Sequence, residues 1–94
     1  MTNLQWLPEA KDDLECLFEF IAPYSQDAAA KAVITMVEAA ESLVEFPQKG
    51  RPWKYDPRFR ELSVSFGARG YVIRYREVKD LVVIVRVWHV RENR

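Results

Sequence analysis

Apolar residues recur every three or four positions through the first half of the chain, and this spacing predicts two amphipathic helices. Leu4 to Leu7 is a short apolar stretch, which predicts a strand that ends at Pro8. Proline suits the first turn of a helix because the N–H that it lacks would have no partner there. We therefore expect a helix that begins at Pro8 and ends near Pro23, with apolar positions at Ala10, Leu14, Leu17, Phe18 and Ile21.

A second helix is predicted between Ser25 and Pro47. Ser25 or Asp27 can cap its first turn, and Pro47 with Gly50 stops it. Because about five residues separate the two helices, they are expected to form an antiparallel hairpin. The apolar face of the second helix comprises Ala29, Val33, Met36, Val37, Ala40, Leu43 and Val44.

The second half of the chain changes to the alternating pattern of β-strands. From Phe59 onward, runs rich in Val, Ile, Tyr and Phe are broken at residues 67–70 and again at Lys79-Asp80, which predicts three strands in a meander. The segment from Gly50 to Pro57 is expected to be a loop. The order strand, helix, helix, strand, strand, strand predicts one α+β domain over residues 1–94, in which the helical hairpin packs on one face of a curled antiparallel sheet.

The two faces of the sheet follow from the positions of the turns. Turns centred on Ala68-Arg69 and on Lys79-Asp80 set Val64 opposite Ile73 and Tyr71 opposite Trp88. This register predicts a core face that meets the helices, with Arg86 as an awkward charged member. The expected core face comprises Leu62, Val64, Phe66, Tyr71, Ile73, Tyr75, Val82, Ile84 and Trp88.

The opposite face is predicted to be a strip of valines bordered by serines, arginines and His89, and no remaining segment of the chain is available to cover it. An uncovered apolar strip with a cationic border is typical of a surface that binds a partner protein. The residues expected to bind that partner are Val72, Arg74, Arg76, Val83, Val85 and Val87.

Charge is divided unequally along a chain whose formal net charge is zero. Residues 1–48 carry a formal charge of −7, and residues 49–94 carry +7. The basic half points to an acidic partner, either a polyanion or an acidic protein segment. The acidic residues of the first helix are expected to form a solvated face.

Several kinds of site are not indicated. One histidine and one cysteine provide neither a metal cluster nor a disulfide, and no glycine-rich loop precedes a helix, so no metal and no cofactor is expected. Cys16 is expected to fill the core. Without a signal-peptide pattern or a long apolar run, the chain is expected to be cytoplasmic and not to enter a membrane.

An ordered set of short motifs resembles the ParE/RelE superfamily of toxins from bacterial type II toxin–antitoxin systems. The resemblance runs nearly from end to end and rests on Trp6, Ala10 with Asp13-Leu14, Glu45-Phe46-Pro47, Gly50-Arg51-Pro52, Arg60-Glu61-Leu62, residues 70–76 and residues 86–91. It implies a cognate antitoxin whose flexible segment wraps the toxin, and hence a hetero-oligomer. It also implies a role in plasmid stabilisation.

Functions within this superfamily differ. RelE-like members cleave mRNA in the ribosomal A site, whereas ParE-like members bind and inhibit DNA gyrase without an established hydrolytic site. Hydrolysis by attack of a 2′-hydroxyl needs a base, an acid and cations on one concave face. In RelE an arginine follows the Gly-Tyr of the central strand and a tyrosine follows the last strand. Here Val72 stands at the first of these positions and no tyrosine stands at the second.

The resemblance therefore favours a ParE-like toxin that inhibits DNA gyrase by binding, neutralised by an antitoxin on the valine strip. The alternatives are a ribosome-dependent mRNA interferase, which would be an endoribonuclease, and a non-toxic antitoxin-binding module. In a ribonuclease, His89, Arg74 and Arg91 would form a rearranged site, although His89 also suits a simple strand-end hydrogen bond. Residues proposed to contact the target lie in the loop, where cations alternate with aromatics, and comprise Arg51, Trp53, Lys54, Arg58 and Arg60.

Overall fold

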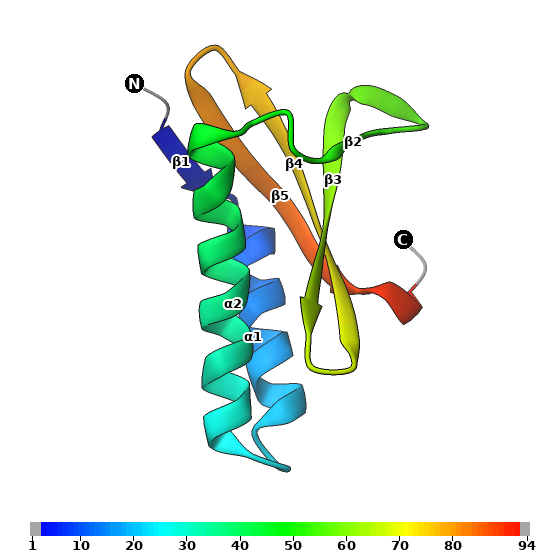
Figure 1. The fold of residues 1–94 in the computed structure, drawn as a ribbon. Coiled ribbons are helices and arrows are strands. Elements are labelled where there is room, and N and C mark those ends of the chain that lie inside the picture. Colours follow the sequence, from blue (N-terminus) through cyan, green and yellow to red (C-terminus); the bar gives the residue numbers. More distant parts are fainter. Residues whose placement is uncertain (1–2, 93–94) are drawn as a thin grey trace.

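Two helices lie side by side on one face of a five-stranded sheet (Figure 1). The computed structural model describes residues 3–92. Its elements are β1 (Asn3–Trp6), α1 (Pro8–Ile21), α2 (Gln26–Glu45), β2 (Arg51–Trp53), β3 (Asp56–Phe66), β4 (Arg69–Val78), β5 (Leu81–His89) and the 3₁₀ turn η1 (Val90–Glu92). The predicted α+β architecture, with a helical hairpin on one face of the sheet, is confirmed.

The helices begin and end where the sequence predicts. Pro8 opens α1, and the Ser25 hydroxyl caps α2 by accepting a hydrogen bond from the Ala28 N–H at 3.0 Å. Alanines on the facing sides let the two helices approach each other and the sheet closely. The buried helical residues are Ala10, Leu17 and Ile21 of α1 and Ala29, Ala32, Met36, Ala40 and Leu43 of α2.

The strand order is β1-β5-β4-β3-β2, and this sheet is mixed rather than wholly antiparallel. β1 runs parallel to β5, with Leu4 beside Val82 and Trp6 beside Ile84. Parallel pairing of the two ends of a chain is a non-local contact that a local sequence pattern does not encode. The predicted loop at Gly50 to Pro57 also differs, because residues 51–53 form β2 and pair with β3 in a hairpin.

The β3–β4 hairpin is shifted by two residues from its predicted register. Val64 lies opposite Tyr71 rather than Ile73, because the turn is Gly67-Ala68 and not Ala68-Arg69. A shift of two residues preserves the face of every side chain, since strands have a period of two. The predicted core residues of β3 and β4 therefore still face the helices.

The β4–β5 hairpin contains a bulge that the sequence analysis did not predict. Tyr75 pairs with Ile84 as expected, but Arg74 pairs with Arg86, which leaves Val85 as an extra residue in β5. Beyond this point the register moves by one residue, and a one-residue shift turns each later side chain to the opposite face. Val87, Trp88 and His89 therefore occupy faces opposite to those predicted.

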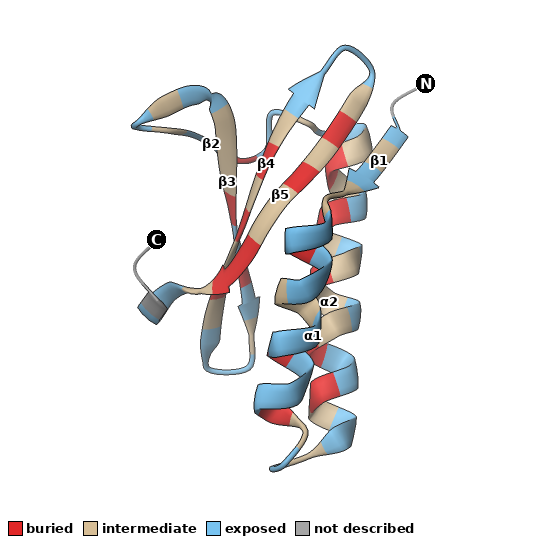
Figure 2. Cartoon of the chain, turned by 180° about the vertical axis from the view of Figure 1, so that it is seen from behind, coloured by how far each residue is buried: buried red, intermediate tan, exposed pale blue. Residues whose placement is uncertain are grey.

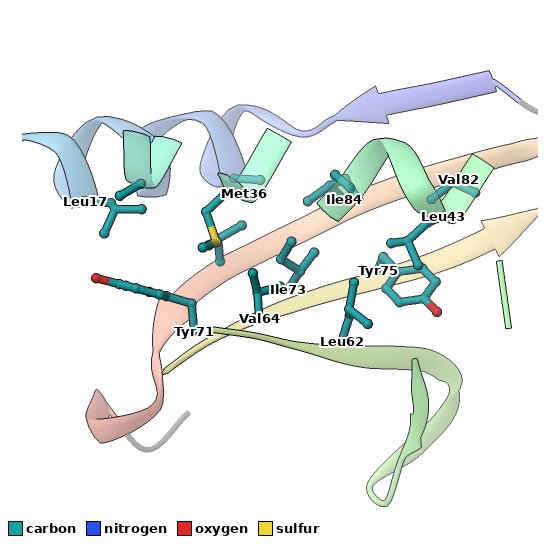
Figure 3. Close-up of a cluster of buried hydrophobic side chains, with 14 of the residues drawn as sticks. Leu17, Met36, Leu43, Leu62, Val64, Tyr71, Ile73, Tyr75, Val82 and Ile84 are labelled. Carbon is teal, nitrogen blue, oxygen red and sulfur yellow. The ribbon is translucent and has the colours of Figure 1, made fainter. Parts of the chain in front are cut away.

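The core lies between the helices and the inner face of the sheet, where buried positions gather along β4, β5 and the facing sides of both helices (Figure 2). Tyr71 and Tyr75 lie at opposite ends of this cluster (Figure 3). In the part of the chain that is described, no charged residue is fully buried, and neither helix is long and apolar enough to cross a bilayer.

Gly67 provides a test of the β3–β4 turn. Its φ of +59° lies in the left-handed region, and a Cβ atom built on it would meet no atom within 4 Å. We expect Gly67→Ala to lower the free energy of unfolding by about 1 kcal/mol through backbone strain alone. Urea unfolding of both proteins measures this difference. An unchanged unfolding midpoint would show that the turn readily adopts another conformation.

Candidate functional site

The face of the sheet that points away from the helices is the larger candidate surface, and we call it the outer face. Both helices lie on the other side of the sheet, so neither covers it (Figures 1 and 2). Val83 and Val85 alternate with the buried residues Val82 and Ile84, and both are half-buried. The residues of the outer face are Ser63, Ser65, Val72, Arg74, Arg76, Val83, Val85 and Trp88.

Arg74 lies on the outer face but is already engaged within the chain. Its Nε and Nη2 donate to one carboxylate oxygen of Glu61 at 3.0 and 2.8 Å. The guanidinium also lies over the ring of Trp53, at 3.9 Å from the centroid, and over the ring of Trp88, at 4.7 Å. Only 13% of the Arg74 side chain is exposed. Arg74 therefore joins β2, β3, β4 and β5 and is less available to a partner than predicted.

Arg76 is the second arginine of the outer face. It lies over the Phe59 ring at 5.4 Å and pairs with Val83 across the sheet. Within residues 3–92 it forms no salt bridge, and its buried Nε has no hydrogen-bond partner. A buried donor without a partner costs free energy that an incoming acceptor would recover. Arg76 is thus positioned beside the valines to meet an acidic group.

The bulge in β5 corrects three predicted positions. Val87, expected on the outer face, is 3% exposed and belongs to the core. Trp88 is buried as expected, at 6% exposure, but it lies opposite Val72 and contacts Arg74 on the outer side of the sheet. His89 faces the helix side, where its ring meets Tyr71 edge-on at 5.2 Å. The partner-binding strip therefore loses Val87, and Trp88 supports it from beneath.

The residues proposed for a rearranged ribonuclease site are divided between the two faces of the sheet. His89 and Arg91 lie together, and the Arg91 N–H donates to His89 Nδ1 at 3.1 Å. Arg74 lies on the outer face with Glu61 and Trp88. The set of His89, Arg74 and Arg91 is consequently not assembled in one place.

The β2–β3 hairpin carries the residues expected to bind a target. Arg51, Lys54 and Arg58 are exposed, and the ammonium group of Lys54 lies over the exposed Tyr55 ring at 4.9 Å. The Arg58 guanidinium donates two hydrogen bonds to the Asp56 carboxylate, and the Arg58 backbone N–H donates a third. These hydrogen bonds lower the pKa of Asp56. This pairing reduces the charge that Arg58 offers to a partner.

The other two residues of that set have structural contacts. Arg60 Nη1 donates to the Gly50 carbonyl at 2.8 Å, and the half-buried Trp53 ring contacts Arg74. The exposed tip of the hairpin is thus formed by Arg51, Lys54, Tyr55 and Arg58.

A groove of about 850 Å³ runs between α1 and the end of the sheet, and we call it the α1 groove. Asp13, Cys16, Leu17 and Phe20 line it from α1. Cys16 is exposed there, so the expectation that it fills the core is wrong. On the sheet side the lining residues include Arg69, Tyr71, Val87, His89, Val90 and Arg91.

Asp13 anchors α1 to the edge of β5 beside this groove. Its carboxylate accepts from Nε and Nη2 of Arg86 at 2.8 and 3.0 Å and from the Val87 N–H at 2.8 Å. β1 does not pair with this part of β5, so the carboxylate satisfies a backbone donor at an open edge. The predicted core position of Arg86 is wrong, because the bulge sets Arg86 opposite Arg74, and its guanidinium forms this ion pair with Asp13.

Among the described residues, no group of three or more histidines, cysteines and acidic residues is placed to hold a metal ion. The α1 groove has no local signature in the sequence, because its walls come from α1, the β3–β4 turn and the end of β5.

Comparisons with known proteins all point to toxins of type II toxin–antitoxin systems. Residues 4–94 match a family model described as the ParE toxin of the type II toxin–antitoxin system parDE. Toxin RelE3 of Caulobacter vibrioides is 37% identical over 94 residues and covers 100% of both chains. Toxin RelE1 of the same organism is 38% identical over 85 residues, which is 90% of this chain and 89% of that protein.

A solved structure, titled as the chromosomal ParDE TA system from P. aeruginosa, shares the fold. It superposes with a TM-score of 0.78 at 25% sequence identity and covers 95% of this chain and 96% of the solved one.

Proposed function

Because the chain belongs to the ParE toxin family of type II toxin–antitoxin systems, we propose that it inhibits DNA gyrase by binding and is neutralised by a cognate antitoxin in the cytoplasm. The antitoxin would cover the outer face, placing apolar side chains on Val72, Val83 and Val85 and a carboxylate beside Arg76. The exposed tip of the β2–β3 hairpin would remain free to contact the target.

The observation that carries this proposal is that the expected ribonuclease residues are divided, with Arg74 on the outer face and His89 and Arg91 beside the α1 groove. His89 is the only histidine of the sequence and lies beside Tyr71, away from the arginines of the outer face. General acid–base catalysis requires the acid, the base and the cations within reach of one reacting phosphate. The outer face and hairpin instead offer apolar, aromatic and cationic contacts, which suit binding.

Two assays on the purified chain test the target. In a supercoiling assay with DNA gyrase, we expect loss of supercoiled product as the chain is added. In a parallel translation assay, we expect mRNA to remain intact when its ends are mapped. Ribosome-dependent cleavage with unchanged supercoiling would contradict the proposal. A chain that is inert in both assays and harmless on expression would indicate a non-toxic antitoxin-binding module.

The mRNA interferase remains a second candidate, because relatives of this chain carry the name RelE and because His89, Tyr71, Arg69 and Arg91 all line the α1 groove. His89→Ala distinguishes it from the first. An interferase that uses His89 as acid or base would lose about 10²–10⁴-fold in cleavage rate. Unchanged toxicity of His89→Ala would exclude this role for the histidine.

Val85→Glu tests the contribution of the outer face to antitoxin binding. A carboxylate at this half-buried position would be desolvated beneath the antitoxin, so we expect affinity to fall about 100-fold, or ~2.7 kcal/mol. Binding of the antitoxin encoded beside the toxin gene can be measured by calorimetry.

Ile34→Glu is the matched control, because it places the same charge on a branched apolar residue that is 55% exposed on α2. Circular dichroism shows whether both variants are folded. Equal affinities for the two variants would contradict an antitoxin site on the outer face.

A further inference from the structure

The tip of the β2–β3 hairpin projects from the body of the molecule. In both views the hairpin extends away from α1 and α2 (Figures 1 and 2). Trp53 pairs with Asp56, so Lys54 and Tyr55 form the turn between the two strands. Tyr55 is 73% exposed there. The narrow end of a two-stranded ribbon therefore presents one aromatic ring and one ammonium group to a partner.

The charges of this hairpin are predominantly cationic. Residues 51–60 contain four basic residues and one acidic residue. Arg51 and Lys54 are exposed, and neither forms a salt bridge with another described residue. Asp56, the acidic residue, is already paired with Arg58. The tip thus attracts anions, although the formal net charge of the whole chain is zero.

Contacts at the base of the hairpin hold it in one orientation. The Arg74 guanidinium of β4 lies over the Trp53 ring at 3.9 Å. The Trp53 ring in turn meets Phe59 edge-on at 6.2 Å and Tyr55 edge-on at 5.5 Å. A cationic projection that is ordered before binding loses less conformational entropy when it binds.

Backbone pairing with a partner strand is disfavoured at this edge of the sheet. β2 is the edge strand, and Pro52 in its centre has no N–H to donate. Prolines and cations on an edge strand are features that prevent the addition of another strand. The hairpin is consequently suited to binding through its side chains.

We propose that the tip of the β2–β3 hairpin binds duplex DNA. The major groove of B-DNA is about 12 Å wide and admits a two-stranded β-ribbon. Arg51, Lys54 and Arg58 would contact phosphates, and the Tyr55 ring would contact base edges. This inference rests on the proposed function, because the DNA would be the duplex held by gyrase. The toxin would then bind the gyrase–DNA complex in preference to gyrase alone.

Single-stranded RNA suits the hairpin less well than duplex DNA. Proteins that bind unpaired bases stack them on several open aromatic faces. Here Arg74 lies over Trp53, and Arg76 lies over Phe59 at 5.4 Å. Among the aromatic residues of the hairpin, Tyr55 is the one that is exposed. An RNA duplex is also unsuitable, because its major groove is too narrow for side chains to read.

Fluorescence anisotropy with a labelled duplex of about 20 base pairs measures the contact directly. We expect the logarithm of the affinity to fall with the logarithm of the salt concentration with a slope of about −2.7, for about three phosphates. Lys54→Ala should weaken binding about tenfold at low salt and make the slope less steep by about 1. Lys11→Ala is the matched control, because it removes an exposed lysine from α1 and should change neither quantity. Equal effects of the two substitutions would overturn the assignment to the tip.

The Tyr55 ring is tested separately from the charges. Tyr55→Ala should weaken DNA binding about tenfold, whereas Tyr55→Phe keeps the ring and should bind within about twofold of the unaltered chain. Circular dichroism and the urea unfolding midpoint show whether both variants are folded. Full DNA affinity in folded Tyr55→Ala would contradict insertion of the tip into a groove.

Gyrase itself distinguishes DNA from a protein surface as the ligand of the tip. We expect the chain to bind gyrase at least about tenfold more tightly when gyrase holds a DNA duplex. Equal affinity with and without DNA would indicate that the tip contacts the gyrase polypeptide and would overturn the inference. Tighter binding of single-stranded RNA than of duplex DNA in the anisotropy assay would overturn it as well.

A supercoiling assay separates failure of this inference from failure of the proposed function. The double variant Arg51→Ala and Lys54→Ala should need at least about tenfold more protein to inhibit gyrase, and it should bind the antitoxin within about twofold of the unaltered chain. If the unaltered chain and the double variant inhibit gyrase equally, the inference is wrong and the proposed function stands. If the chain binds DNA through the tip but leaves supercoiling unchanged, the proposed function is wrong and the DNA site stands.

Discussion

Replacing Gly50 with alanine is expected to lower the free energy of unfolding by about 3 kcal/mol, because overpacking and a lost buried hydrogen bond add together. A Cβ atom at this position would lie 2.7 Å from the Tyr75 hydroxyl oxygen and 2.9 Å from the Glu61 carbonyl oxygen. The Tyr75 hydroxyl accepts from the Gly50 N–H at 2.9 Å and donates to the Pro47 carbonyl at 2.7 Å. The substitution would therefore break the hydrogen bonds that join the segment between α2 and β2 to Tyr75 of β4.

Urea unfolding followed by circular dichroism measures this effect. Gly70→Ala is the matched control, since its Cβ would meet only the two methyl groups of Val90, at 3.3 and 3.5 Å, and we expect it to cost less than about 1 kcal/mol. Equal costs for the two variants would show that the contact with Tyr75 is not the cause. Burial also raises the pKa of the Tyr75 hydroxyl above its ordinary value of 10.0. The protonated hydroxyl therefore contributes to stability below pH 10, and this contribution is lost as the pH rises further.

Replacing Arg74 with alanine is expected to cost about 2–3 kcal/mol of stability and to loosen the β2–β3 hairpin. The change leaves the Glu61 carboxylate, 28% exposed, without the paired guanidinium and opens a space beside Trp53 and Trp88. Tryptophan emission should shift to longer wavelength as both rings gain contact with water. If the hairpin binds the target, inhibition of the target should weaken together with this shift.

Two further variants show whether the geometry of the guanidinium matters. Arg74→Lys keeps the charge but not the planar group that lies over the indole rings, so we expect it to recover about half of the loss. Arg76→Ala removes the neighbouring arginine, which contacts neither indole ring and forms no described salt bridge, and should change stability little. Full stability in Arg74→Ala would show that the indole contacts contribute nothing measurable.

Much of the fold could be predicted from local patterns, and the errors have definite causes. Apolar residues that recur every three to four positions predicted the helices, and those that alternate predicted most strands. The misplaced β3–β4 turn left the faces of both strands correct, because the pairing is shifted by an even number of residues. The bulge at Val85 could not be predicted, since no glycine or proline marks it. It inverted Arg86, Val87, Trp88 and His89, of which Val87 and His89 belong to the predicted site.

The candidate site was harder to predict because it is assembled from distant segments. The strand pattern does not distinguish Arg74 from Arg76 of β4. In the structure Arg74 contacts Glu61 and two tryptophans, whereas the Nε of Arg76 has no described partner. Asp13 gave no sign of its role, because its partners lie on β5 at the other end of the chain. The alternation of the strands correctly placed Val72, Val83 and Val85 on the outer face.

Because β1 pairs with β5, the sheet is completed late in folding. Asn3 pairs with Leu81, so the first strand finds its neighbour only after almost all of the chain has been synthesised. Contacts between such distant residues slow folding, and the exposed edge of β5 stays open until β1 docks. During translation the helical hairpin can form early, but the finished sheet, and with it both faces described above, exists only after the ribosome has released the last strand.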